Sequence, residues 1–219
     1  IKVFQELEDL AEDVHGPSFR AFSDLAKNQN CFICYSFPRR VKDGRFNIST
    51  SVVDKNGDLV ANYDKWHVCS TGVCREKDYF FSGKSPFAAF NVKGIKVGLA
   101  ICYDIRFPEL VRKLTLEQGI SLLLHPGGWP RDERFHTWHT FVKVRAIENS
   151  IYIMSTNWAG PDNGCTAFCP PFLDGKNWKL EKLGSAPGLL SGIVDINYLN
   201  KVRQRYPYLT DRNVDMYNL

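Results

Sequence analysis

Cys102 is the residue whose type and position could most readily perform covalent chemistry. It ends an apolar segment, residues 97–102, and precedes a predicted helix. In layered α/β proteins, ligands bind where strands end. The positive end of a following helix and a cation such as Arg106 would favour the thiolate, which is the nucleophilic form of cysteine. Cys102 is therefore a candidate nucleophile, and the alternative is a thiol that only fills the end of a buried strand.

Lys65 is a second candidate, for electrostatic rather than covalent chemistry. It follows a predicted strand and is flanked by aromatic residues that include Tyr63 and Trp66. Between bulky apolar neighbours a lysine can be drawn inward, where its ammonium would stabilise a developing oxyanion. The alternative is a surface lysine whose aliphatic stem lies along apolar side chains.

Metal binding is the third chemistry to consider. The pairs whose spacing a metal could use are His136 with His139, Cys31 with Cys34, and Cys69 with Cys74. The first cysteine pair lies in an apolar run that is expected to be a strand, where residues three apart point to opposite faces. Trp138, between the histidines, indicates a packed aromatic face. We therefore expect no metal site.

The composition bounds the class of protein. The 219 residues are 44% hydrophobic and 24% charged, which excludes disordered and collagen-like chains. The net charge is only +4, and the lysines and arginines are scattered among acidic residues and form no basic cluster. No nucleic-acid partner is therefore expected. No apolar run is long enough to cross a membrane, and no secretory signal is visible. Seven cysteines without a repeat favour a reducing compartment. These features predict one cytoplasmic domain over residues 1–219.

The first half of the chain is expected to contain two helices and several hairpins. Apolar residues at helical spacing predict a helix over residues 4–14, and a second helix is expected over 18–27. The Asn56-Gly57 pair is a strong hairpin signal between two strands. The predicted strands cover residues 31–37, 47–53, 59–63, 87–91 and 95–101.

In the second half, strands and helices alternate, which is typical of layered sheets with crossover helices. The predicted helices cover residues 108–118, 135–149 and 197–205, and the predicted strands cover residues 121–125, 150–156 and 189–195. Cys102 and Lys65 would thus both lie where strands end.

Residues 98–110, Gly-Leu-Ala-Ile-Cys-Tyr-Asp-Ile-Arg-Phe-Pro-Glu-Leu, resemble the nucleophile motif of the nitrilase superfamily, the carbon–nitrogen hydrolases. Residues 63–67 are similar to the family's catalytic-lysine motif, and Glu76 matches a second glutamate often found there. Further similar blocks, in the family's order, are residues 145–149, 155–160, 205–207 and 211–212. The resemblance therefore extends over nearly the whole chain.

The resemblance implies a four-layer αββα sandwich and pairing into a homodimer or a higher homo-oligomer. It also implies a mechanism in which the Cys102 thiolate attacks an amide carbonyl. Lys65 and the backbone N–H of Tyr103 would stabilise the oxyanion, by about 3–4 kcal/mol per donor. An amine leaves, and water then hydrolyses the thioester. Glu76 would orient Lys65 or the substrate, and no cofactor is required.

The sequence departs from the family pattern at the general base, a glutamate in a Pro-Glu motif on an early strand. Glu6 is the only candidate near the start, but its spacing places it on the polar side of a helix. We therefore expect the given chain to begin just after the motif, without the first strand and helix. The alternatives are that Glu6 is the general base or that the site has no general base.

Substrate choice would depend on residues outside these motifs. Trp129 stands where the family places pocket-wall residues, although it could instead pack against Trp158. Arg106 and Asn157 would fix the loops around the nucleophile. The expected substrate is a small primary amide, for example an omega-amide of a dicarboxylate. The alternatives are an N-carbamoyl amidohydrolase, or a catalytically silent member that binds a ligand or a partner.

Overall fold

The computed structural model describes residues 6–41, 44–84, 86–172 and 180–217. The chain folds as two compact units. The first comprises residues 1–90 with 99–104, and the second comprises residues 91–98 with 105–219. Among the described residues, no helix has the combination of length and apolar composition that crossing a bilayer requires.

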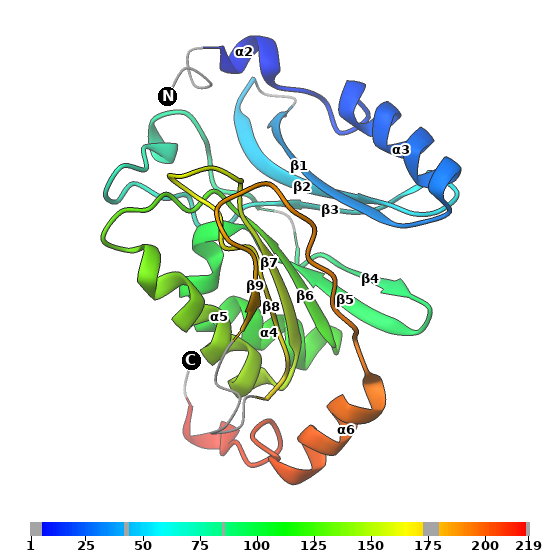
Figure 1. Cartoon of the computed structure of the whole chain (residues 1–219), viewed down its shortest axis with the longest axis vertical. Helices are drawn as coiled ribbons and strands as arrows, with labels where there is room; N and C mark the ends of the chain where they lie inside the picture. Colours follow the sequence, from blue (N-terminus) through cyan, green and yellow to red (C-terminus); the bar gives the residue numbers. More distant parts are fainter. Residues whose placement is uncertain (1–5, 42–43, 85, 173–179, 218–219) are drawn as a thin grey trace. The chain divides into compact units, whose positions relative to one another are not determined.

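The first unit is built on an antiparallel sheet in which the described strands run in the order β1-β2-β3 (Figure 1). The strands are β1 (Ile33–Arg40), β2 (Phe46–Val53) and β3 (Leu59–Asp64). The predicted turn joins β2 to β3, where Gly57 N–H donates to the Asp54 carbonyl at 2.8 Å with a positive φ of 81°. The hairpin prediction is confirmed.

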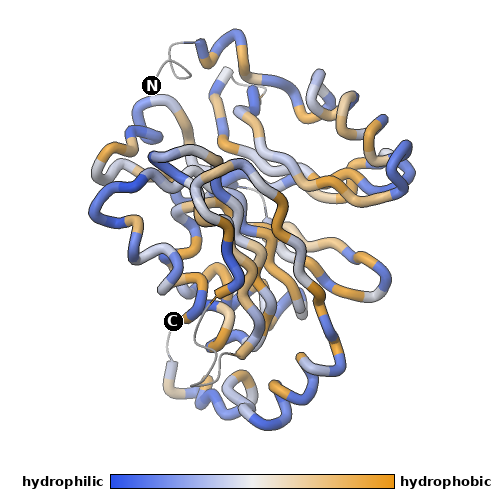
Figure 2. Tube along the Cα trace, viewed as in Figure 1, coloured by the Kyte–Doolittle hydropathy of each residue, from blue (hydrophilic) through white to orange (hydrophobic). Residues whose placement is uncertain are grey.

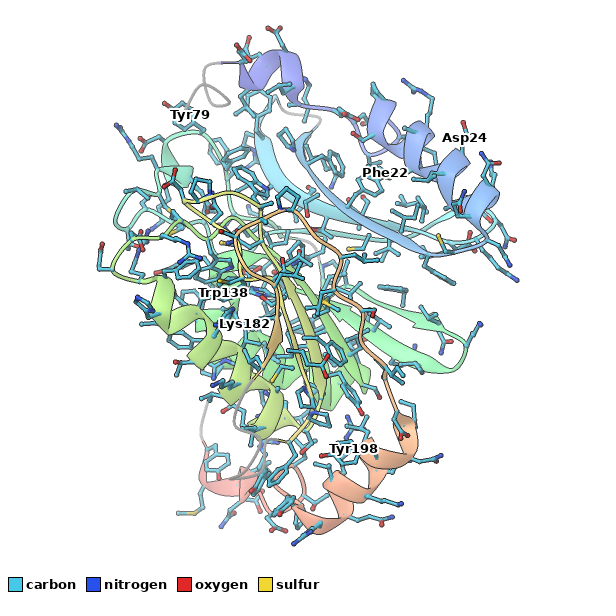
Figure 3. All side chains as sticks on the ribbon, in the orientation of Figure 1. Phe22, Asp24, Tyr79, Trp138, Lys182 and Tyr198 are labelled. Atoms are coloured by element: carbon cyan, nitrogen blue, oxygen red, sulfur yellow. The ribbon has the colours of Figure 1, made fainter. Side chains whose placement is uncertain are left out.

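Helix α3 (Pro17–Gln29) packs on this sheet. Pro17 begins the helix because its fixed φ suits the first turn, and Asn30 ends it in the left-handed conformation. Phe22, labelled in Figure 3, points from α3 towards the sheet and stacks on Tyr35 of β1 at 4.4 Å between ring centroids. The prediction of a helix over residues 18–27 is confirmed.

The predicted helix over residues 4–14 is wrong for most of its length. Helix α2 covers only Leu7–Leu10, and residues 1–5 lie outside the described residues. Ala11 is extended, and Glu12 pairs with the edge of β1, donating to the Pro38 carbonyl at 3.0 Å. The unpaired backbone groups of an edge strand therefore compete successfully with the helical periodicity.

The second sheet has the described strands in the order β4-β5-β6-β7-β8-β9. The strands are β4 (Ala89–Val92), β5 (Ile95–Leu99), β6 (Leu122–Pro126), β7 (Tyr152–Thr156), β8 (Ala167–Cys169) and β9 (Glu181–Lys182). The pair β6–β7 is parallel, whereas β8 and β9 are antiparallel to their neighbours. Hydrophobic residues recur along most strands of both sheets, whereas β9 and most of α6 are hydrophilic (Figure 2).

The helices of the second unit are α4 (Pro108–Gln118), α5 (Phe135–Asn149) and α6 (Ile196–Arg205). The first two have the predicted bounds. Short 3-10 helices cover Glu76–Asp78 in the first unit and Val214–Met216 in the second. A third covers Cys102–Arg106, of which residues 102–104 belong to the first unit and residues 105–106 to the second.

The predicted strand over residues 189–195 is wrong, because the structure has no strand there. Exposure nevertheless differs between neighbouring residues: Leu189 is 92% exposed and Ile193 is 83% exposed, whereas Leu190 and Val194 pack on a buried cluster. The segment therefore packs on the hydrophobic core through these side chains, but its backbone does not pair with a described strand. The sheet is extended instead by β8 and β9, which were not predicted.

Candidate active site

Lys65 lies immediately after β3 and is almost fully buried, with 1% of its surface exposed. Its backbone is held on both sides: its N–H donates to the Ile48 carbonyl at 2.8 Å, and its carbonyl accepts from Gly83 N–H at 2.8 Å. Only glycine fits at position 83, because a Cβ there would lie 2.3 Å from the Asp64 carbonyl oxygen. The surface-lysine alternative is therefore wrong.

The buried ammonium of Lys65 is bound by Glu76. Its Nζ lies 2.7 Å from Oε1 and 2.6 Å from Oε2 of that carboxylate. Glu76 is itself held by Cys69, whose N–H donates to Oε2 at 2.7 Å and whose carbonyl accepts from the Glu76 N–H at 2.9 Å. A residue that is predicted to orient Lys65 is thus in direct contact with it.

The electrostatic surroundings keep Lys65 protonated. Burial lowers the pKa of its ammonium, but the negative charges of Cys102 and Glu76 outweigh burial, so that the pKa lies above the ordinary lysine value. Lys65 and Cys102 both belong to the first unit, and the thiol lies near enough for its charge to act on the ammonium. The structure therefore brings Lys65, Glu76 and Cys102 together.

Cys102 occupies a turn that few residue types adopt. It is the first residue of the 3-10 helix Cys102–Arg106, its φ is +47°, and only 9% of its surface is exposed. The left-handed region costs a non-glycine residue about 1–3 kcal/mol and persists only where surrounding contacts impose it. The conformation therefore needs a specific anchor.

Asp104 provides that anchor. Its fully buried carboxylate accepts from the Ile101 N–H at 3.0 Å and from the Tyr63 hydroxyl at 2.9 Å. It also accepts from the His67 N–H at 3.0 Å and contacts Nδ1 of the His67 ring at 2.7 Å. These bonds tie the turn that carries Cys102 to the segment that carries Lys65. Sequence reasoning missed this role, and the available signal was an acid two residues after the candidate nucleophile.

Replacing Asp104 with asparagine should disturb the position of Cys102. An amide keeps the size of the side chain but loses the charge that strengthens each of these hydrogen bonds. We expect stability to fall by about 2–3 kcal/mol and the alkylation rate of Cys102 to fall with it. Chemical unfolding and timed alkylation measure both effects. Asp58→Asn, at an exposed acid beside the hairpin turn, is the control, and an unchanged Cys102 alkylation rate would contradict the anchoring role.

Arg106, Trp129 and Asn157 meet in the second unit. The Arg106 guanidinium lies 5.5 Å from the Trp129 ring centroid. Asn157 Oδ1 accepts from the Trp129 N–H at 2.8 Å, and its Nδ2 donates to the Trp129 carbonyl at 3.0 Å. Asn157 thus fixes the backbone of the loop that carries Trp129.

Trp129 does pack against a tryptophan, but it is Trp138. The two indoles stack at 5.4 Å with an interplanar angle of 6°, whereas Trp158 is 68% exposed. Trp138, labelled in Figure 3, extends from α5 and donates its indole N–H to Ser155 Oγ at 2.9 Å. The role of Trp129 as a pocket wall stays a prediction.

Arg145 is a further residue that sequence reasoning left without a role. Its buried guanidinium donates from Nε to the Ile105 carbonyl at 3.0 Å and from Nη2 to the Arg106 carbonyl at 3.1 Å, and from Nη1 to Glu148 at 2.8 Å. Within the second unit, the block over residues 145–149 therefore supports the backbone that follows the candidate nucleophile.

The remaining candidates lie elsewhere. Glu6 is exposed and precedes α2, and Tyr103 is half-buried next to Cys102. His136 is exposed, whereas the ring of His139 contacts the Cys165 carbonyl through Nε2 at 2.9 Å. Within the described ranges, no group of three or more potential ligands is arranged to hold a metal ion.

Comparison with known proteins decides the family. The carbon-nitrogen hydrolase family matches residues 2–197, which is most of the chain. The chain is a carbon-nitrogen hydrolase of the nitrilase superfamily. A hydrolase of Pseudomonas protegens is 30% identical to it, over 95% of this chain and 72% of that protein. An omega-amidase of Mus musculus is 27% identical, over 96% of this chain and 78% of its own length.

Solved structures show the same fold. A carbon-nitrogen hydrolase from Helicobacter pylori superposes with a TM-score of 0.82 at 22% identity, covering 99% of this chain and 77% of that one. The amidase from Nesterenkonia sp. AN1, as a cysteine-to-alanine mutant with butyramide, gives a TM-score of 0.72 at 25% identity and covers 91% of this chain and 71% of that one. The carbon-nitrogen hydrolase therefore has the nitrilase-superfamily fold.

Proposed function

We propose that this carbon-nitrogen hydrolase is a cysteine-dependent amidase that releases ammonia from a small primary amide. The observation that carries the proposal is the buried Lys65 ammonium, which Glu76 binds on one side and which interacts electrostatically with Cys102. A thiol near an ammonium that stays protonated at neutral pH is stabilised as the thiolate, and the same ammonium can stabilise the negative charge of a tetrahedral intermediate.

In the first half-reaction, the Cys102 sulfur attacks the amide carbonyl carbon. The carbonyl oxygen gains negative charge, which Lys65 and the N–H of Tyr103 stabilise. Removing one such donor from an oxyanion hole typically lowers kcat by about 10²–10³-fold. The carbon–nitrogen bond then breaks, the amine leaves protonated as ammonia, and the acyl group stays on Cys102 as a thioester.

In the second half-reaction, water hydrolyses the thioester and restores the thiol. Both halves need a general base, first for the thiol proton and then for water. Both oxygens of Glu76 bind Lys65, so we assign Glu76 to orienting the ammonium rather than to this role. Glu6 remains a candidate base only by sequence, since it is exposed ahead of α2.

The relatives favour a small amide substrate. They include an omega-amidase and a deaminated glutathione amidase of Mus musculus. The Nesterenkonia amidase has been solved with butyramide, and a glutamate-to-leucine mutant of it carries the acetamide moiety of fluoroacetamide on its active-site cysteine. We propose an omega-amide of a dicarboxylate as the substrate class. The αββα layering and the homodimer that the resemblance implies stay predictions.

Product analysis separates the candidate functions. We expect ammonia without carbon dioxide from butyramide and from succinamate, the monoamide of a dicarboxylate. Ammonia accompanied by carbon dioxide, formed only from N-carbamoyl amino acids, would instead show an N-carbamoyl amidohydrolase. No product from any of these compounds, combined with calorimetric binding of one of them, would show a ligand-binding member without catalysis and would contradict the proposal.

A further inference from the structure

Cys69 and Cys74 form a thiol pair in the loop that carries Glu76. The loop turns where Cys74 N–H donates to the Thr71 carbonyl at 3.1 Å, with Gly72 at a positive φ of 58°. The Cys69 sulfur is hydrogen-bonded to the side chain of Cys74 and lies 3.4 Å from Thr71 Oγ1. The two sulfurs are therefore within hydrogen-bond distance, although neither belongs to a disulfide.

This pair differs chemically from the thiols of Cys34 and Cys169. The hydrogen bond from Cys74, opposed by burial and helped by Thr71 and the charge of Lys65, lowers the pKa of Cys69 to about 4. Burial raises the pKa of Cys34 and of Cys169 to about 12. At neutral pH, Cys69 is thus a thiolate in contact with a thiol, and the half-buried Cys74 is the sulfur that solvent reaches more readily.

We propose that Cys69 and Cys74 are a reversible oxidation site, at which a peroxide converts the hydrogen-bonded thiol pair into a disulfide. The oxidised loop would hold Glu76 less well against Lys65. The site is distinct from the catalytic thiol, Cys102, and its effect on activity rests on the function proposed above.

The oxidation balances with hydrogen peroxide as the two-electron oxidant. The Cys69 thiolate attacks one peroxide oxygen: the sulfur–oxygen bond forms, the oxygen–oxygen bond breaks, and the released hydroxide takes the Cys74 thiol proton and leaves as water. The Cys74 thiolate then attacks the Cys69 sulfur, so that the sulfur–sulfur bond forms and the sulfur–oxygen bond breaks. The departing hydroxide takes a proton from solvent and leaves as a second water.

The loop transmits the change to Lys65 by two routes. Closing a disulfide between Cys69 and Cys74 would reposition the loop that contains the Cys69 backbone. That backbone donates to Glu76 Oε2 and accepts from the Glu76 N–H. Oxidation also removes the Cys69 negative charge, which interacts with Lys65. Both changes would weaken the interactions that hold the Lys65 ammonium in place.

Peptide mapping tests the site without reference to activity. Trypsin releases residues 66–75, which contain both cysteines, and residues 97–106, which contain Cys102. After brief peroxide treatment of the full chain and alkylation with iodoacetamide, we expect the 66–75 peptide to be two hydrogens lighter and unalkylated. A thiol reductant should reverse this. Full alkylation of that peptide, or a sulfinic acid on one of its cysteines, would overturn the proposal.

Amidase assays test whether the Cys69–Cys74 disulfide affects catalysis. We expect the reductant-reversible loss of amidase activity to follow the fraction of the 66–75 disulfide. Cys74→Ser should keep its basal activity and lack this reversible component, whereas Cys31→Ser, at an exposed cysteine of the same unit, should behave as wild type. A disulfide that forms without loss of activity would overturn the coupling. A protein with no amidase activity at all would refute the proposed function while the mapping still decides the oxidation site.

Discussion

Replacing Cys102 with alanine is expected to lower kcat by roughly 10⁴- to 10⁶-fold, the range found when a catalytic nucleophile is removed. The reason is that the thioester is the route by which one difficult hydrolysis becomes two easier steps. Alanine, like cysteine, has a Cβ, so the substitution adds no strain to the left-handed backbone at position 102. The hydrogen bonds of Asp104 do not involve the Cys102 sulfur. Stability should therefore change little.

Steady-state ammonia release and a thermal unfolding curve measure these two effects on the same preparation. Cys31→Ala is the matched control, because Cys31 is exposed and belongs to the same unit as Cys102. The nucleophile assignment is wrong if Cys102→Ala retains more than about one hundredth of wild-type kcat, since the residual catalysis of a site without its nucleophile lies far lower.

Replacing Lys65 with methionine should have the second-largest effect. Methionine keeps the length of the side chain but removes the ammonium that would stabilise the oxyanion, so kcat should fall by about 10²–10³-fold. It also leaves the Glu76 carboxylate without its cation. Breaking a buried ion pair in this way typically costs about 3–5 kcal/mol. Since Glu76 is partly exposed, we expect the lower end of that range.

A double variant separates catalysis from stability. In Lys65→Met combined with Glu76→Gln, no buried charge remains unpaired, so the unfolding midpoint should largely recover while kcat stays low. Lys55→Met, at the exposed hairpin turn, is the control lysine. Recovery of kcat together with stability would show that Lys65 serves folding alone, and the oxyanion assignment would then be wrong.

The raised pKa of Lys65 sets the pH range of its contribution. Because the folded-state pKa lies above the ordinary lysine value, the stabilisation is fully present below that ordinary value. It is lost as the pH rises through the folded-state pKa. The ion pair therefore persists through neutral pH.

Much of the site could be predicted from the sequence because its residues stand in contiguous blocks. Cys102, Lys65 and Glu76 each lie at the end of a strand or in the loop after it, and the structure brings them together. Asp104 was missed because two of its hydrogen-bond partners, Tyr63 and His67, are more than thirty positions away. Cys69 and Cys74 were considered only as possible metal ligands. Their contact was not predicted, because the residue types between them do not indicate the turn that brings them together.

In the fold, too, local patterns were predictable, whereas elements defined by distant partners were not. Helices over residues 108–118 and 135–149 were predictable from local spacing and from proline or glycine at their ends. Strands β8 and β9 are too short to have a pattern of their own, and pairing with neighbouring strands defines them. The segment over residues 189–195 has the alternation of a strand, but its apolar residues pack on a cluster instead.

The central claim is that the sulfur of Cys102 becomes acylated by the substrate. Rapid acid quenching during turnover of a primary amide, followed by tryptic digestion and mass spectrometry, tests it most directly. The peptide over residues 97–106 is predicted to gain the mass of the substrate's acyl group, and hydroxylamine should remove it. An acyl group on another cysteine, or turnover by Cys102→Ala at the wild-type rate, would contradict the account.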